Sequence, residues 1–222
     1  MSTRHSENVK GVVFDLDGTL LDMLEDLGNC MNSVLQQLGF APHPVEEYRF
    51  CVGDGIKALV ERTLPQGRRD AETVERGVAA MQEEYDRRWD ESTRLYDGVP
   101  QMLEALSQRQ MPMAILSNKP EVFTKLTVER LLPQWHFDPL RGARQDTPRK
   151  PDPAAALAIA AVWGVEPAQC LYLGDTNTDM ATAVGAGMFA VGAAWGFRPG
   201  EALKASGAEV LVQDPMELLG LL

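Results

Sequence analysis

Two carboxylates, Asp15 and Asp17, directly follow a short apolar run at residues 12–14. Such a run is typical of a strand buried on both faces of a parallel sheet, and open α/β folds bind their ligands at the ends of such strands. In an extended strand the two side chains would face the same side, although Gly18 indicates that the chain turns there. Asp-Gly is also a common turn and Asp a favoured helix N-cap. The pair alone therefore leaves a catalytic and a structural interpretation open.

Three further polar segments follow or precede apolar ones in a similar way. They are Ser117 and Asn118 after residues 113–116, Lys150 beside Pro151 before an alanine-rich stretch that begins at Ala154, and Asp175 and Asp179 after residues 170–174. Each segment is weak evidence by itself, but their order and context agree. Together with the first pair, they make the chain resemble the haloacid dehalogenase superfamily of phosphatases.

This resemblance implies an α/β fold, with a Rossmann-like parallel-sheet core and an inserted helical cap. We expect residues 1–21 and 96–222 to form the catalytic core and residues 22–95 the cap. The rhythm of apolar runs and helical patterns also favours a parallel sheet with crossover helices. The strands that the sequence predicts are residues 9–15, 113–117, 169–174, 188–191 and 209–211.

The predicted cap has no strand-like run. Its apolar residues recur at three- and four-residue steps, which predicts helices over residues 24–38, 56–64 and 74–89. Leu38-Gly39 is a typical helix end, and the prolines at 42, 44 and 65 separate the helical segments. A cap that closes over the site would exclude water and limit the size of the substrate.

The resemblance gives Asp15 the role of nucleophile, which attacks phosphorus and forms an aspartyl phosphate. Asp17 would protonate the leaving oxygen and later accept a proton from the attacking water. Dehalogenases of the superfamily lack an acid at this position, so Asp17 favours phosphoryl transfer. Ser117 and the amide of Asn118 would hydrogen-bond the phosphate. Gly18 and Thr19 complete the predicted substrate site of the core.

Lys150 would pair with Asp15 and with the phosphate. The structural alternatives are a helix cap for Ser117 and a solvated surface charge for Lys150, which is the usual position of a lysine. Mg²⁺ is the expected cofactor, because a carboxylate that attacks a phosphate dianion needs neighbouring positive charge. Its predicted ligands are Asp15 and Asp175, with the backbone carbonyl of Asp17. Asp179 would orient a metal-bound water, or would instead be an acid favoured at a helix N-terminus.

Within the predicted cap, Gly53, Asp54 and Gly55 resemble the glycine-rich cap segment of phosphoglycolate phosphatases. An ordinary turn and helix start explains the same residues. We expect a small phosphorylated metabolite as substrate, with 2-phosphoglycolate first. Pyrophosphate, a sugar phosphate and a phosphomutase reaction stay open as alternatives, as does a phosphate-binding module without turnover.

Composition limits the range of functions. The chain has 222 residues, of which 45% are hydrophobic, enough for one core domain with an insertion. Its net charge of -11 argues against a nucleic-acid partner. The three cysteines form no close pair, and residues 2–8 are too polar for a signal peptide. The longest apolar stretch, residues 154–165, is shorter than the roughly 20 residues that span a bilayer. We therefore expect a cytoplasmic monomer or homodimer that binds no membrane.

Overall fold

The computed structural model describes residues 9–222, so the polar segment at residues 2–8 lies outside the described residues. The chain forms two compact units. One consists of the residues up to Leu21 together with Leu95–Leu222, and the other is Asp22–Arg94. We call them the sheet unit and the helical unit. The chain passes between them at two short strands that pair with each other, β2 (Leu21–Asp22) and β3 (Arg94–Leu95).

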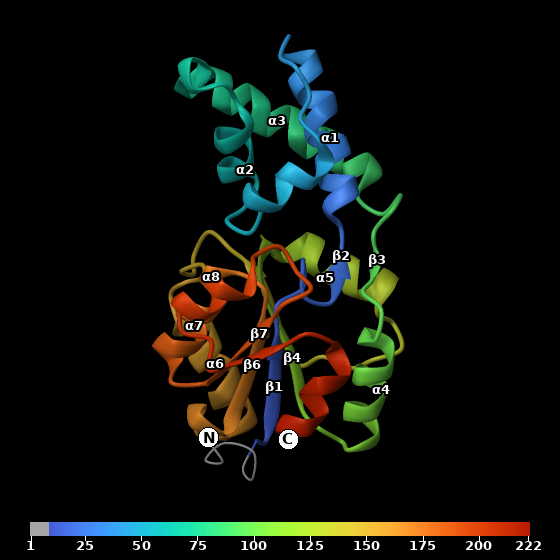
Figure 1. The fold of residues 1–222 in the computed structure, drawn as a ribbon, viewed down its shortest axis with the longest axis vertical. Helices are drawn as coiled ribbons and strands as arrows, with labels where there is room; N and C mark the ends of the chain where they lie inside the picture. Colours follow the sequence, from blue (N-terminus) through green and yellow to red (C-terminus); the bar gives the residue numbers. More distant parts are fainter. Residues whose placement is uncertain (1–8) are drawn as a thin grey trace. The chain divides into compact units, whose positions relative to one another are not determined.

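The sheet unit contains a six-stranded sheet in which every pair of neighbours is parallel (Figure 1). Its strands are β1 (Gly11–Phe14), β4 (Met113–Pro120), β5 (Leu140–Ala143), β6 (Cys170–Gly174), β7 (Phe189–Ala193) and β8 (Val210–Val212). The order across the sheet is β5-β4-β1-β6-β7-β8. The predicted parallel α/β fold is confirmed.

The strand order explains where a ligand can bind in this sheet. The chain runs from β1 to β4 and β5 on one side, and then returns to build β6, β7 and β8 on the other side. In open α/β sheets such a reversal leaves a crevice at the carboxyl ends of the strands beside it. The polar residues that follow β1 and β6, and those at the end of β4, therefore meet at one edge of the sheet.

Helices cover both faces of the sheet (Figure 1). One face packs against α4 (Val99–Gln108) and α5 (Glu121–Leu131), and the other against α6 (Ala154–Trp163), α7 (Asn177–Ala186) and α8 (Gly200–Ala205). Alternate residues of a strand enter opposite apolar clusters: Val12 and Phe14 pack on the first face, and Val13 on the second. This double burial explains why the strands read as continuous apolar runs.

All five strands expected from the sequence are present, and no end is shifted by more than three residues. The sequence did not predict β5, whose residues Leu-Arg-Gly-Ala contain no apolar run. This strand lies at the edge of the sheet and is only partly buried, so it needs no such run.

The helical unit contains α1 (Leu24–Gln37), α2 (Ile56–Thr63) and α3 (Ala71–Arg88). The helix α3 begins three residues before the predicted start, because the Asp70 side chain accepts a hydrogen bond from the Thr73 N–H and caps the helix. Two short 3-10 helices, Val45–Phe50 and Gln66–Arg68, directly follow the helix-breaking prolines. In the described part of the chain, no helix combines the length and the apolar character needed to cross a membrane.

A buried carboxylate, Asp26, ties the start of α1 to the segment after α3. Its side chain accepts hydrogen bonds from the Ser92 N–H at 2.9 Å, the Thr93 N–H at 2.8 Å and the Thr93 hydroxyl at 2.6 Å. Asp26 is only 2% exposed, and Ser92 and Thr93 are partly buried. The contacts hold the beginning and the end of the helical unit together.

We expect Asp26→Ala to lower the free energy of unfolding of the helical unit by about 2 kcal/mol, because it leaves partly buried donors of Ser92 and Thr93 without their acceptor. Amide hydrogen exchange across α1 and α3 would measure the loss in this unit directly. Glu25→Ala is the matched control, since Glu25 is the exposed neighbour on the same helix, and it should change stability by about 0.5 kcal/mol or less. Equal effects of the two substitutions would contradict this role of Asp26.

Candidate active site

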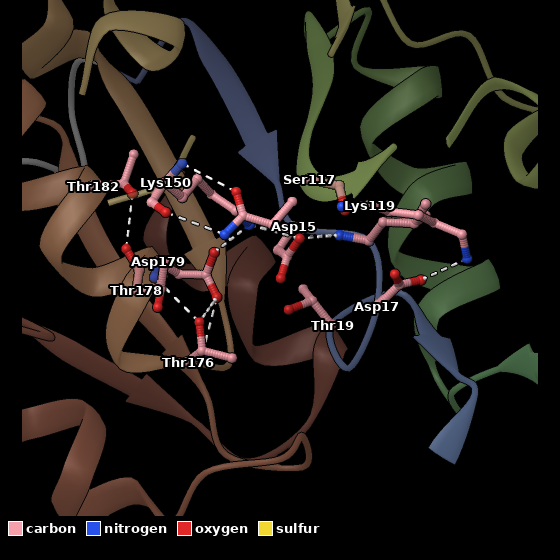
Figure 2. Close-up of polar contacts among 12 residues, drawn as sticks. Asp15, Asp17, Thr19, Ser117, Lys119, Lys150, Thr176, Thr178, Asp179 and Thr182 are labelled. Carbon is pink, nitrogen blue, oxygen red and sulfur yellow. Dashed lines mark hydrogen bonds and ion pairs between the residues drawn. The ribbon is translucent and has the colours of Figure 1, made fainter. Parts of the chain in front are cut away.

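The polar side chains singled out in the sequence of the sheet unit come together at the carboxyl end of the sheet (Figure 2). Asp15 follows β1, and Ser117 belongs to β4. Lys150 comes from the connection before α6, while Asp175 and Asp179 lie around the turn from β6 into α7. Segments far apart in the sequence thus bring these groups to one region, as the strand order requires.

Lys150 is the charged group that joins these segments. Its Nζ lies 2.8 Å from Asp15 Oδ1 and 2.7 Å from Asp179 Oδ1 (Figure 2). The residue is 7% exposed, so it does not occupy the solvated surface position of an ordinary lysine. Its short bonds to two carboxylates are those expected of charge-assisted pairs.

The side chain of Asn118 holds the backbone of Lys150. Asn118 Nδ2 donates to the Lys150 carbonyl at 3.2 Å, and Asn118 Oδ1 accepts from the Lys150 N–H at 3.0 Å. A side-chain amide can bind a peptide group in this reciprocal way, because it carries a donor and an acceptor. Asn118 therefore fixes the lysine, and its backbone amide is the part that fits the predicted phosphate contact.

Asp179 is an acid at the start of a helix, as one of its two interpretations held, and it also contacts Lys150. It stands in the first turn of α7 and makes a reciprocal cap with Thr176, whose N–H and hydroxyl both donate to Asp179 Oδ2. Its Oδ1 accepts from Lys150 Nζ and from the Tyr172 hydroxyl at 3.1 Å. Both oxygens of Asp179 thus have protein donors, which suits a residue that orients its neighbours.

Asp175 is held by the loops around it. Thr19 Oγ1 donates to one carboxylate oxygen at 2.9 Å, and the Phe197 N–H donates to the other at 2.7 Å. Gly18 and Gly196 lie so close that a Cβ on either would collide with Asp175. Gly18 also has a φ of 91°, which other residues rarely adopt. Gly18 and Thr19 therefore contact the carboxylate of Asp175.

Three buried carboxylates form the centre of the candidate site. One oxygen from each of Asp15, Asp175 and Asp179 can be chosen so that all lie within 4.8 Å of one another. Burial, reinforced by the charge of Asp179, raises the pKa of Asp175 to about 7 and raises that of Asp15 well above its usual range. Burial alone would lower the pKa of Lys150, but the carboxylates of Asp15 and Asp179 raise it well above its usual range. One ammonium thus faces more negative charge than it can balance.

Asp17 occupies a different position from this cluster. In Figure 2 it lies on the far side of Asp15 from Lys150, and its Oδ1 is 3.3 Å from the Nζ of Lys119. The Asp17 side chain is 20% exposed, so its carboxylate is accessible to solvent as well as to Lys119. Asp15 and Asp17 therefore have separate environments, although only one residue stands between them.

Ser117 is 3% exposed and belongs to β4, which excludes the alternative that it caps a helix. Its Oγ accepts from the Lys119 N–H at 3.1 Å. The hydroxyl hydrogen can still be donated to a ligand.

The predicted cap residues Gly53, Asp54 and Gly55 belong to the helical unit, so the geometry above does not include them. Gly53 and Gly55 both have positive φ, and Gly55 is the residue before α2. Asp54 pairs with Arg62, which also donates to the Cys51 carbonyl. The segment is therefore an ordered start of α2, which fits both interpretations of its sequence.

Sequence analysis assigned no role to several groups that the structure brings to the site. Examples are Lys119, the Tyr172 hydroxyl and the Phe197 N–H. Lys119 had a signal in the sequence, because it stands two residues after Ser117 and alternation along a strand places both on one face. The contacts of Tyr172 and Phe197 arise only from the fold.

Comparison with known proteins finds relatives named as phosphatases. A phosphoglycolate phosphatase from Pseudomonas putida is 34% identical over 212 residues, which cover 94% of this chain and 78% of that protein. One from Chromobacterium violaceum is 32% identical and covers 97% of both chains. A crystal structure from Lactobacillus delbrueckii subsp. bulgaricus, provisionally named phosphoglycolate phosphatase, has a TM-score of 0.89 at 27% identity, covering 95% of this chain and 97% of that one.

The model of the haloacid dehalogenase-like hydrolase family matches residues 12–193, a range that includes all of β1 except Gly11, all of β4 and β6, and every residue of the carboxylate cluster. The chain belongs to the haloacid dehalogenase-like hydrolases.

Proposed function

We propose that this protein is a Mg²⁺-dependent phosphatase that hydrolyses 2-phosphoglycolate, a small phosphorylated metabolite, through an aspartyl phosphate on Asp15. The observation that carries the proposal is the position of Asp15. Its Oδ1 lies 2.8 Å from Lys150 Nζ, and its carboxylate belongs to the cluster formed with Asp175 and Asp179. The names of the relatives from Pseudomonas putida and Chromobacterium violaceum support the choice of substrate.

In the proposed reaction a carboxylate oxygen of Asp15 attacks phosphorus, and the bond from phosphorus to the ester oxygen breaks. Lys150 supplies positive charge beside Asp15, which reduces the repulsion between two anions. Ser117 and the Asn118 amide hydrogen-bond the phosphoryl oxygens from the end of β4. Water then attacks the phosphorus of the aspartyl phosphate, which restores Asp15 and releases inorganic phosphate.

Asp17 is the proposed general acid and base. It gives a proton to the leaving oxygen in the first step, and in the second step it accepts a proton from the attacking water. Its place beside Asp15 but outside the contacts of Lys150 suits a group that must exchange protons. The two aspartates then differ in role because they differ in neighbours.

The carboxylate cluster suits a hard divalent cation, because its donors are all oxygens and its negative charge exceeds that of Lys150. Asp15 and Asp175 are the proposed ligands, with the backbone carbonyl of Asp17, while Asp179 orients Lys150 and would orient a water bound to the metal. A bound Mg²⁺ would neutralise charge on the phosphoryl oxygens during transfer. Thr19 and the Phe197 N–H hold the Asp175 carboxylate in place for this task.

We further propose that the helical unit is the cap, and that Gly53, Asp54 and Gly55 contact the substrate. A closed cap would keep bulk water from the aspartyl phosphate and admit only small esters. Pyrophosphate, sugar phosphates and a phosphomutase reaction are the alternatives within the superfamily. A screen of small phosphate esters with Mg²⁺, repeated with a chelator, tests the class of substrate, and release of free phosphate separates hydrolysis from mutase action.

Asp15→Asn should lower kcat for 2-phosphoglycolate by about 10⁴-fold or more, because the amide cannot act as the nucleophile. Release of inorganic phosphate is the measurement. Asp86→Asn, a change of the same kind at an exposed position of α3, should leave kcat unchanged. Turnover by the Asp15 variant at the wild-type rate would refute the mechanism and would favour a different nucleophile.

Asp17→Asn should lower kcat/KM for 2-phosphoglycolate by about 10²- to 10⁴-fold. The loss should be much smaller for p-nitrophenyl phosphate, because p-nitrophenolate is a stable anion that leaves without a proton. Steady-state kinetics on both esters with one enzyme preparation makes the comparison internal. If both esters lose the same factor, Asp17 is not the acid that protonates the leaving group.

Mg²⁺ affinity should fall by about tenfold or more per pH unit below pH 7, because protons compete for Asp175, whose pKa is raised to about 7, and for Asp15, whose pKa is also raised. Without metal, the raised pKa of Asp175 means that the folded chain keeps a proton that the unfolded chain releases above about pH 4. The free energy of unfolding of the metal-free protein should therefore fall as the pH rises from about 4 through about 7. Calorimetric Mg²⁺ titrations at several pH values measure the affinity, and thermal unfolding with a chelator measures the stability. Affinity that does not change between pH 5.5 and pH 8 would contradict the assignment of Asp175, and Asp175→Asn is the control.

A further inference from the structure

Two basic side chains are buried in the described part of the chain, and both lie at the candidate active site. Lys150 is 7% exposed and Lys119 is 9% exposed. Lysines are rarely buried unless they are paired, so a second buried lysine at the same site needs an explanation. The proposed reaction gives Lys150 a role but leaves Lys119 without one.

The two lysines serve different parts of the site. Lys150 contacts Asp15 and Asp179, whereas Lys119 contacts Asp17 and lies on the other side of Asp15 (Figure 2). Lys119 also belongs to the same strand as Ser117, and its N–H donates to the Ser117 hydroxyl. Figure 2 shows the Lys119 side chain extending toward Asp17.

The contact between Lys119 and Asp17 is longer than the ion pairs of Lys150. Nζ and Oδ1 are 3.3 Å apart, compared with 2.8 Å and 2.7 Å for the two pairs of Lys150. Charge-assisted hydrogen bonds between nitrogen and oxygen are about 2.7–2.9 Å long. An ammonium carries three donors, so contacts with Asp17 and with a ligand are compatible.

We infer that Lys119 is a specificity-determining residue that binds an anionic group on the leaving alcohol. This inference rests on the proposed function, in which Asp17 contacts the ester oxygen. Because the Lys119 ammonium lies beside Asp17, it can contact the part of the leaving alcohol that is attached to the ester oxygen. In 2-phosphoglycolate a single methylene separates the ester oxygen from a carboxylate, which places an anion within reach of Lys119.

Charge explains why a cation is needed at this point. A doubly charged phosphate and a carboxylate must both enter a site lined by Asp15, Asp17, Asp175 and Asp179, in a chain of net charge -11. Lys150 is bound to two of these carboxylates. Because Lys119 is largely removed from water, its attraction to a substrate carboxylate is screened less than that of a surface lysine.

The test compares two esters that differ in this one group, 2-phosphoglycolate and ethyl phosphate. The quantity is the ratio of their kcat/KM values. Lys119→Met should lower this ratio by about 100-fold, the loss expected when one partner of a buried charge pair is removed. Lys119→Arg keeps the charge and should retain most of the ratio. For phosphoethanolamine, whose leaving group carries an ammonium, Lys119→Met should raise kcat/KM relative to ethyl phosphate.

Lys125→Met is the matched control, since Lys125 is an exposed lysine of α5 that pairs with Glu121. It should change the ratio by about threefold or less. If Lys119→Met lowers kcat/KM for all three esters by one common factor, Lys119 only positions Asp17 and the inference is overturned. That pattern differs from a failure of the proposed function, in which wild-type protein releases phosphate from none of the esters and both proposals fall.

Discussion

The buried ion pairs of Lys150 are the interaction on which the site depends. A single ammonium joins a carboxylate that follows β1 to a carboxylate in the first turn of α7. Removing one member of such a buried set leaves an uncompensated charge, which is strongly destabilising. The fold therefore specifies the positions of Asp15, Lys150 and Asp179 together, and each of them positions the other two.

The ion pairs do not balance the charge they gather. Asp175 lies in the same cluster, and its pKa is raised because burial and the charge of Asp179 both disfavour its ionised form. The surrounding donors are arranged to keep these groups in position in spite of that repulsion. Tyr172 and Thr176 hold Asp179, Thr19 and the Phe197 N–H hold Asp175, and Asn118 holds Lys150. A site of this kind is prepared for a cation and an anion before either arrives, which reduces reorganisation during reaction.

Much of the sheet unit could be predicted from the sequence, because its strands are buried on both faces and their apolar runs are continuous. The strand β5 could not, since an edge strand with the sequence Leu-Arg-Gly-Ala carries no apolar signal. The positions of Asp15 and Asp175 directly after strands also followed from those runs, whereas β4 continues beyond Ser117 to Pro120.

The contacts among site residues were less accessible to sequence analysis. Asn118 and Lys150 are 32 residues apart, and Thr19 and Asp175 are 156 apart, so only the folded sheet brings them together. The periodicity that predicted α3 placed its start three residues late, because a cap such as Asp70 depends on one side-chain hydrogen bond rather than on a pattern of apolar residues.

The pairing of β2 with β3 also has a consequence for the history of the chain. The outgoing and returning segments leave the sheet unit side by side, so insertions or deletions between them can accumulate, and whole modules can be exchanged, without altering the order of the parallel strands.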